Sequence, residues 1–202
     1  MKPWPLIVVA VLACSLEVVA QTAAPTQPIS KIVDGMHAKW GLECQSVSAA
    51  LASAKPEDAP VLTSKKDLSC TCIPQAVDAA FPAAERAGQI TEGGYQSRMS
   101  GPFSVCMART LRERMAAACD KGQDPFAGPG ERSTPARTSA RCTCARNELA
   151  KHADMSLAQA SKESAARYEA QVAAASPGKP APTPDRPVSV VDAVGNKCGA
   201  IE

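Results

Sequence analysis

The sequence predicts an all-α protein whose helices are joined by Pro/Gly-rich loops and tied together by disulfides. Apolar residues recur at helical spacing along most of the chain, and the longest alternating β-branched run is short, at 188–191. The tripeptide Cys-Thr-Cys occurs twice, at 70–72 and 142–144, and a single cysteine precedes each copy at a similar distance. Together these observations predict two tandem helical pseudo-repeats that are cross-linked by disulfides.

Residues 1–20 have the three regions of a cleavable signal peptide. Lys2 gives a short positive start, residues 6–14 form an unbroken apolar run, and 18–20 supply modest or small side chains before a cleavage point. The apolar run is too short for a permanent membrane helix, which needs about 20 residues. We therefore expect a periplasmic or secreted protein of Gram-negative bacterial type, with no transmembrane segment after cleavage.

Cys14 allows a second interpretation of this segment. Val11-Leu12-Ala13-Cys14 resembles the lipobox of bacterial lipoproteins, which implies lipidation of the cysteine and a membrane-anchored product. The apolar run continues past the cysteine, and this favours simple cleavage instead. In either case Cys14 leaves the disulfide count, and eight of the nine cysteines remain.

The composition argues against some classes of partner. The chain has 22 basic and 20 acidic side chains, a net charge of +2, which gives no electrostatic reason to expect nucleic acid or an anionic membrane surface. Aromatic residues make up only 3% of the chain, so the core must consist of small and medium side chains. Such a core gains from disulfides, each worth about 2–4 kcal/mol.

The first pseudo-repeat is expected over residues 28–101, after a flexible segment at 21–27. The apolar stripe of its first helix is Cys44, Val47, Leu51 and Ala54. Pro56 ends that helix, because proline clashes with a continuing helix. Pro74 suits the first turn of the next helix. The face that follows is Val77, Ala80 and Phe81. Gly93-Gly94 predicts a break.

The second pseudo-repeat is expected over residues 102–176. Its clearest amphipathic helix begins at Pro102 and is closed by Gly122 as a C-cap. The apolar stripe of this helix is Phe103, Met107, Leu111, Met115 and Ala118. Residues 122–140 lack periodicity and predict a loop. Helix then resumes after Cys144, with Asp154 as the N-cap of its continuation.

The C-terminal part of the chain begins with a Pro-rich spacer at 177–187. Residues 188–202 follow as a tail that Cys198 cross-links to the rest. Pro28, Pro102 and Pro187 each open a Pro-x-Ser sequence before apolar residues, which supports the internal repeat.

Eight cysteines allow 105 pairings, and the sequence alone does not select one. The predicted disulfide cysteines are Cys44, Cys70, Cys72, Cys106, Cys119, Cys142, Cys144 and Cys198. The pattern favours one bond within each pseudo-repeat, from Cys44 and from Cys119 to the tripeptide of the same copy. Cys106 and Cys198 then take the remaining tripeptide sulfurs. We expect each tripeptide to be extended, so that its two cysteines point to the same side.

An alternative use of the tripeptides is a soft-metal site, in which Cys-x-Cys thiolates and the nearby Met107 and Met115 bind copper as Cu(I). An oxidising compartment argues against free thiolates, and the Cys-x2-Cys spacing of zinc sites is absent. We therefore predict neither a metal nor a cofactor.

His37 and His152 are the only histidines, and either could serve as the base of an uncharacterised envelope hydrolase. No nucleophile elbow, His-Glu-x-x-His or phosphate-binding glycine motif accompanies them. We therefore expect no catalytic residue and no enzymatic activity. Our hypothesis is an exported, non-catalytic protein that binds another macromolecule of the cell envelope, as an inhibitor, an immunity-type protein or an accessory component.

Overall fold

A computed structural model describes residues 25–128, 130–174 and 190–201. The predicted signal peptide with Cys14, and the predicted spacer at 177–187, lie outside the described residues. Within the described ranges, no helix combines the length and apolar character needed to cross a membrane.

The described chain is mostly helical, which confirms the predicted fold class. The helices are α1 (Ile29–Ala52), α2 (Ala59–Asp67), α3 (Ile73–Ala80), α4 (Glu92–Asp120), α5 (Pro135–Ala153), α6 (Leu157–Ala174) and α7 (Val190–Gly199). A π-helical turn, Leu68–Cys72, joins α2 to α3, and a short 3-10 turn, Ala83–Glu85, follows α3.

Two short strands form the rest of the regular structure. Strand β1 (Thr26–Pro28) pairs antiparallel with β2 (Gln89–Thr91), with Thr26 opposite Thr91. The prediction of a flexible segment at 21–27 is therefore wrong for its last two residues. Pairing with a strand that lies far along the chain gives no local periodic signal, because it depends on the tertiary fold.

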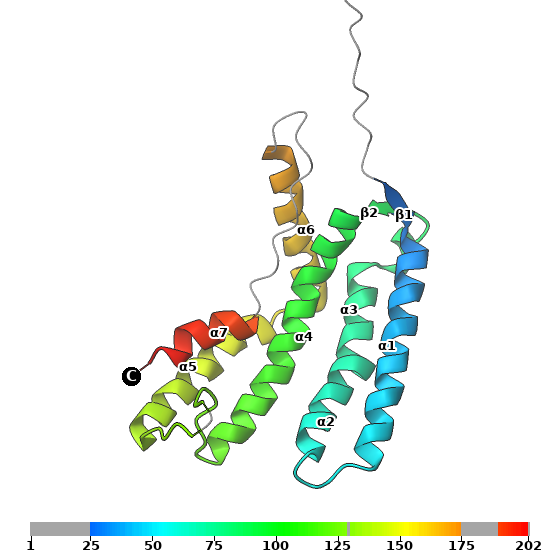
Figure 1. Ribbon diagram of the computed structural model, residues 1–202. Coiled ribbons are helices and arrows are strands. Elements are labelled where there is room, and N and C mark those ends of the chain that lie inside the picture. Colours follow the sequence, from blue (N-terminus) through cyan, green and yellow to red (C-terminus); the bar gives the residue numbers. More distant parts are fainter. Residues whose placement is uncertain (1–24, 129, 175–189, 202) are drawn as a thin grey trace, which may run out of the picture.

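Helix α4 is the central element of the fold (Figure 1). Helices α1, α2 and α3 lie on one side of it, α5 and α7 lie on the other, and α6 packs along it. One buried cluster contains Val33, Ile73 and Phe81, and the other contains Leu149 and Val194. Helix α4 contributes to both clusters.

The tandem repeat is not confirmed. The predicted boundary at 101/102 falls inside α4, which is continuous across it. Leu157, at the start of α6 and well within the predicted second pseudo-repeat, packs against the first cluster. The two halves of the chain are therefore interleaved rather than packed as separate units.

Helix α1 buries one face along its whole length. Its inward stripe extends the predicted one toward the N-terminus and consists of Ile29, Val33, Met36, Trp40, Cys44, Val47 and Leu51. The spacing of three and four residues keeps these side chains on one face of a helix. The helix ends at Ala52, shortly before Pro56, as predicted.

Helix α3 follows the sequence prediction closely. Pro74 lies in its first turn, directly after the π-helical turn Leu68–Cys72. Val77 and Ala80 are buried, and Phe81 is fully buried just after the helix.

Two predictions about α4 are wrong. Gly93-Gly94 does not break the chain but forms the first turn of the helix, where Thr91 is the N-cap and accepts a hydrogen bond from the Gly94 amide. Pro102 lies inside the helix and is buried, so the helix begins ten residues earlier than expected. Tertiary contacts on both sides of α4 outweigh the local preference of proline for a helix start.

The predicted apolar stripe of α4 is also shifted. Phe103 is exposed, and Met107, Leu111 and Met115 are only half-buried, whereas Val105 and Cys106 are buried. The helix is covered on more than one side, so a single stripe does not describe its buried surface.

Helices α4 and α6 approach closely because glycines face the contact. A Cβ atom at Gly101 would overlap the carbonyl oxygen of Ala160 and lie 2.7 Å from its carbonyl carbon. A Cβ atom at Gly93 would collide with the Tyr168 hydroxyl in the same way. The Gly101 contact is with backbone, which cannot move without shifting the whole helix.

The segment after α4 contains a further correction. Gly122 follows α4 with φ +68°, and its amide and that of Gln123 bond to the carbonyls of Cys119 and Ala118, so the predicted glycine C-cap is confirmed as a Schellman motif. The predicted loop at 122–140 ends early, because Thr134 caps α5 and accepts a hydrogen bond from the Arg137 amide.

Asp154 does not have its predicted role either. It ends α5, and its carboxylate pairs with Arg112 of α4 at 2.6 Å. Ser156 instead lies before α6 and accepts a hydrogen bond from the Gln159 amide.

Gly101→Ala should destabilise the protein, because the added methyl group forces α4 and α6 apart, a change that costs about 1–3 kcal/mol in packed cores. Gly35→Ala in α1 is the matched control, since nothing lies within 4 Å of the place that its added methyl group would take, and it should instead stabilise by up to about 1 kcal/mol. Urea unfolding followed by circular dichroism measures both. Equal stability of the two variants would contradict the close contact.

Candidate functional site

The eight predicted cysteines form four disulfides. The bonds are Cys44–Cys70, Cys72–Cys106, Cys119–Cys142 and Cys144–Cys198. This is the arrangement that the sequence pattern favoured, with one bond inside each copy and the remaining tripeptide sulfurs taken by Cys106 and Cys198.

The predicted extended conformation of the tripeptides is wrong. Residues 70–72 lie in the π-helical turn, and 142–144 lie within α5. In a helix, positions i and i+2 are about 200° apart around the axis, so the two sulfurs point to opposite sides. Each tripeptide therefore connects its own helix to two different neighbours. Cys70 and Cys72 reach α1 and α4, and Cys142 and Cys144 reach α4 and α7.

The disulfides argue against the alternative in which the Cys-x-Cys thiolates bind copper. All four tripeptide sulfurs are engaged in disulfides and are not thiolate ligands in this structure. In the described ranges, His, Cys, Asp and Glu side chains do not gather in groups of three that could hold a metal ion.

The structure brings a carboxylate to one of the two histidines. Nε2 of His37 on α1 lies 3.0 Å from Oδ1 of Asp78 on α3, and Arg86 contacts the same oxygen at 2.7 Å. Nothing in the sequence pattern predicted this group, because its members are brought together by helix packing. No described Ser, Thr or Cys side chain is hydrogen-bonded to His37, so the group lacks an activated nucleophile.

His152 lies in the last turn of α5 and is exposed. No hydrogen bond or ion pair joins its ring to another described side chain. The two histidines are therefore not part of a common site.

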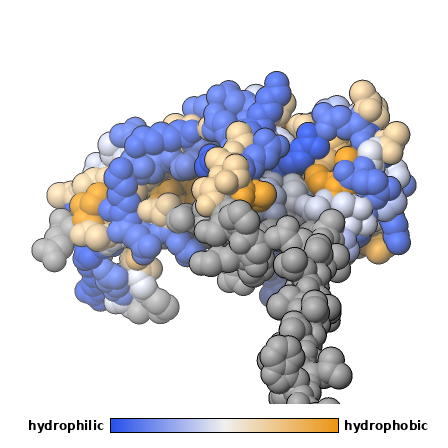
Figure 2. Space-filling view, turned by 90° about the horizontal axis from the view of Figure 1, so that it is seen from above, coloured by the Kyte–Doolittle hydropathy of each residue, from blue (hydrophilic) through white to orange (hydrophobic). Residues whose placement is uncertain are grey.

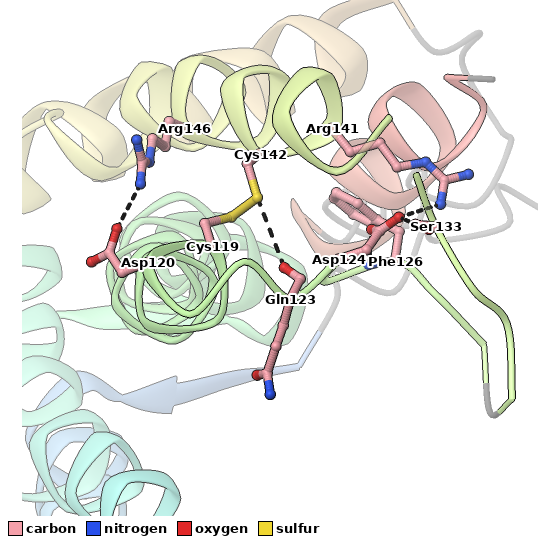
Figure 3. The surroundings of a disulfide bond; sticks show 9 residues. All are labelled: Cys119, Asp120, Gln123, Asp124, Phe126, Ser133, Arg141, Cys142 and Arg146. Carbon is pink, nitrogen blue, oxygen red and sulfur yellow. Dashed lines mark hydrogen bonds and ion pairs between the residues drawn. A yellow bond between two sulfur atoms is a disulfide. The ribbon is translucent and has the colours of Figure 1, made fainter. Parts of the chain in front are cut away.

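A buried ion pair fixes the loop between α4 and α5 (Figure 3). Arg141 of α5 lies 2.9 Å from Asp124, and the two side chains are only 4% and 2% exposed. Arg141 also donates to the carbonyl oxygens of Gly199 and Ile201 at the end of the chain. One side chain thus holds the loop and the C-terminal segment together.

The Asp124 carboxylate is stabilised in its charged form. Burial by itself would raise the pKa of Asp124, but hydrogen bonds from Ser133, the Phe126 amide and Arg141, with the Arg141 charge, together lower it below its ordinary value. The carboxylate is therefore ionised at neutral pH, and the buried charge of Arg141 is compensated.

Asp124→Asn should cost about 3–5 kcal/mol, because it leaves the buried Arg141 charge without a counter-ion. The matched control is Asp120→Asn, which breaks an Arg146 pair whose two side chains are 56% and 70% exposed, and it should cost at most about 1 kcal/mol. Chemical denaturation of both variants gives the comparison. A small loss in Asp124→Asn would show that the ion pair does not hold the loop.

Glu148 of α5 pairs with Lys151 on the same helix and with Lys197 on α7, and the second pair links the two helices. Its carboxylate lies 2.7 Å from Lys151 and 2.7 Å from Lys197. The hydrogen bonds from Lys151 and Lys197 lower the pKa of Glu148 from 4.5 to about 2. Because the folded-state pKa is the lower one, the stabilisation is present above about pH 4.5 and is lost as the pH falls toward 2.

Glu148→Gln should therefore lower the melting temperature at pH 7, and the difference from the unsubstituted protein should vanish as the pH approaches 2. Glu113→Gln is the control, because Glu113 is exposed and forms no ion pair or hydrogen bond within the described chain. Melting curves at several pH values between 2 and 7 test this. A difference that persists unchanged at pH 2 would contradict it.

The structure also has a shallow pocket of about 450 Å³ beside the Cys119–Cys142 disulfide. One face of α5 forms most of its wall, through Pro135, Thr138, Ser139, Cys142, Thr143 and Arg146. Cys119, Gly122 and Ser133 complete the lining from the end of α4 and the following loop. Most of these residues lie in the segment predicted to be a loop, and only the Thr134-Pro135 helix start signals that part of it is helical.

Comparison of the chain with protein-family models, with curated proteins and with solved structures gave no match.

Proposed function

We propose that this is an exported, non-catalytic protein that binds another protein in the cell envelope, in an inhibitory, immunity-type or accessory role. Four disulfides are consistent with an oxidising compartment, because cytosolic thiols are kept reduced. They also support a binding role. Cross-linked helices present a preorganised surface, which reduces the entropy lost when a partner binds.

The outer face of α1 is the surface that carries this proposal. Opposite its buried stripe, α1 has a line of exposed, uncharged residues, Gly35, Ala38, Leu42, Gln45, Ala49 and Ala52. The spacing alternates between three and four residues, which is the heptad spacing of a helix-pairing seam. Leu42, at its centre, is 68% exposed.

The position of α1 makes this face accessible. Helix α1 lies at the edge of the molecule, with α2 and α3 packed on its inner side (Figure 1). Elsewhere, the face shown in Figure 2 is mostly hydrophilic, with small and separate hydrophobic areas. A partner helix laid along 35–52 would meet small side chains and one leucine, so the two backbones could approach closely.

The test is affinity capture from envelope extract with the tagged, disulfide-bonded protein. We expect a specific protein partner, and Leu42→Lys should reduce its capture at least about 10-fold, since it places a charge in the seam. Val172→Lys on α6 is the matched control, because Val172 is also exposed, at 42%, and it should leave capture unchanged.

Two results would contradict the proposal. Equal capture by both lysine variants would show that α1 is not the docking face. Turnover of a model substrate by the purified protein, with loss of turnover in His37→Ala or His152→Ala, would instead support a hydrolase.

A further inference from the structure

The pocket beside Cys119–Cys142 is lined by a mostly buried threonine whose hydroxyl group has no hydrogen-bond partner among the described residues. Thr138 is only 8% exposed, and no hydrogen bond joins its hydroxyl to another described residue. Helical hydroxyls elsewhere in the chain, such as those of Thr63 and Ser164, donate to a carbonyl one turn earlier. Thr138 lines the pocket instead. Because no polar side-chain atom in the described structure is both fully enclosed and unpaired, its hydroxyl keeps some accessible surface. It is therefore open to a ligand.

Further donors lie along the same face of α5. Ser139 and Thr143 also line the pocket, and their hydroxyls have no hydrogen-bond partner within the described chain. Arg146 lies on the same wall and donates to Asp120 beside the disulfide (Figure 3). The wall thus offers several hydroxyl groups and one guanidinium within about three turns of a helix.

The charges around the pocket favour an anion. The nearby carboxylates already have cationic partners, since Asp120 pairs with Arg146, Asp124 with Arg141, and Glu131 with Arg137. Two cationic residues that are adjacent in sequence to lining residues have no ion pair in the described part of the chain. They are Lys121, beside Gly122, and Arg132, beside Ser133.

The position of the pocket on α5 adds to this preference. Pro135, Thr138 and Ser139 belong to the first two turns of a 19-residue helix, where the helix dipole is positive. The volume of about 450 Å³ is within the usual range for small-molecule sites and exceeds what a single inorganic ion would fill.

We propose that this pocket binds a small organic molecule through an oxyanion group, with the Thr138 hydroxyl and the Arg146 guanidinium as donors. Charge-assisted hydrogen bonds from a guanidinium and hydroxyls are the usual means of holding a phosphate ester or a carboxylate. The site lies on α5, away from the outer face of α1, and does not depend on protein binding there.

The test uses three probes that share one sugar framework, namely glucose 6-phosphate, gluconate and glucose, titrated into the full disulfide-bonded protein. Amide chemical shifts of residues 138–146 report binding. We expect saturable shifts with one or both anions and at least about 10-fold weaker binding of neutral glucose. The anion that binds more tightly shows whether the site prefers a phosphate ester or a carboxylate.

Four variants test the proposal, because each has a different expected effect on anion affinity. Arg146→Gln and Thr138→Val should each weaken anion binding at least several-fold. Asp120→Asn should strengthen anion binding, because the substitution frees Arg146 from its intramolecular partner. Arg114→Gln, the charge-matched control, removes an exposed arginine from α4 that does not line the pocket and should leave affinity unchanged.

Three outcomes would overturn the proposal. They are glucose binding as tight as anion binding, equal weakening by Arg114→Gln and Arg146→Gln, and no saturable shift at 138–146 by about 10 mM of either anion. Unchanged circular dichroism in each variant shows that lost binding is not lost folding. None of these outcomes bears on capture through Leu42.

Discussion

Helix α4 joins the two sides of the molecule, and its close contact with α6 depends on a glycine in the middle of the helix. Gly101 lets the α4 backbone lie directly against the carbonyl of Ala160, and α4 also supplies Cys106 to one hydrophobic cluster and Ala108 to the other. A change in the α4–α6 spacing would disturb the first cluster, against which Leu157 of α6 packs. This shared helix explains why the chain folds as interleaved segments, although its cysteine pattern suggests two successive units.

Covalent and ionic links complete a core that has few large side chains. The disulfides join α1, the π-helical turn, α4, α5 and α7 into one network, since each tripeptide connects to two neighbours. Arg141 adds a non-covalent link of the same kind, because it binds Asp124 in the loop and two carbonyl groups near the chain end. Such links limit the conformational freedom of an alanine-rich core, which gains little from the burial of large apolar groups.

The two candidate surfaces differ in chemistry and in position. The outer face of α1 is uncharged and suits a helix, whereas the α5 pocket has unpaired hydroxyls and neighbouring cations and suits an anion. Both lie mainly on cross-linked helices, although the loop after α4 completes the pocket. The His37–Asp78–Arg86 group is exposed and lacks a neighbouring nucleophile, so it contributes less to a functional interpretation.

Local sequence features predicted the helical class, the start of α3 at Pro74, the glycine cap at Gly122 and the cysteines that pair. These features depend on residues within one or two turns, or on the spacing of a repeated motif. The sequence could not predict that Pro102 lies inside a helix, that Cys-Thr-Cys is helical, or that Asp78 meets His37 and Asp124 meets Arg141. Those outcomes depend on how distant helices are aligned against one another, and packing energy at that level outweighs the local preference of a single residue.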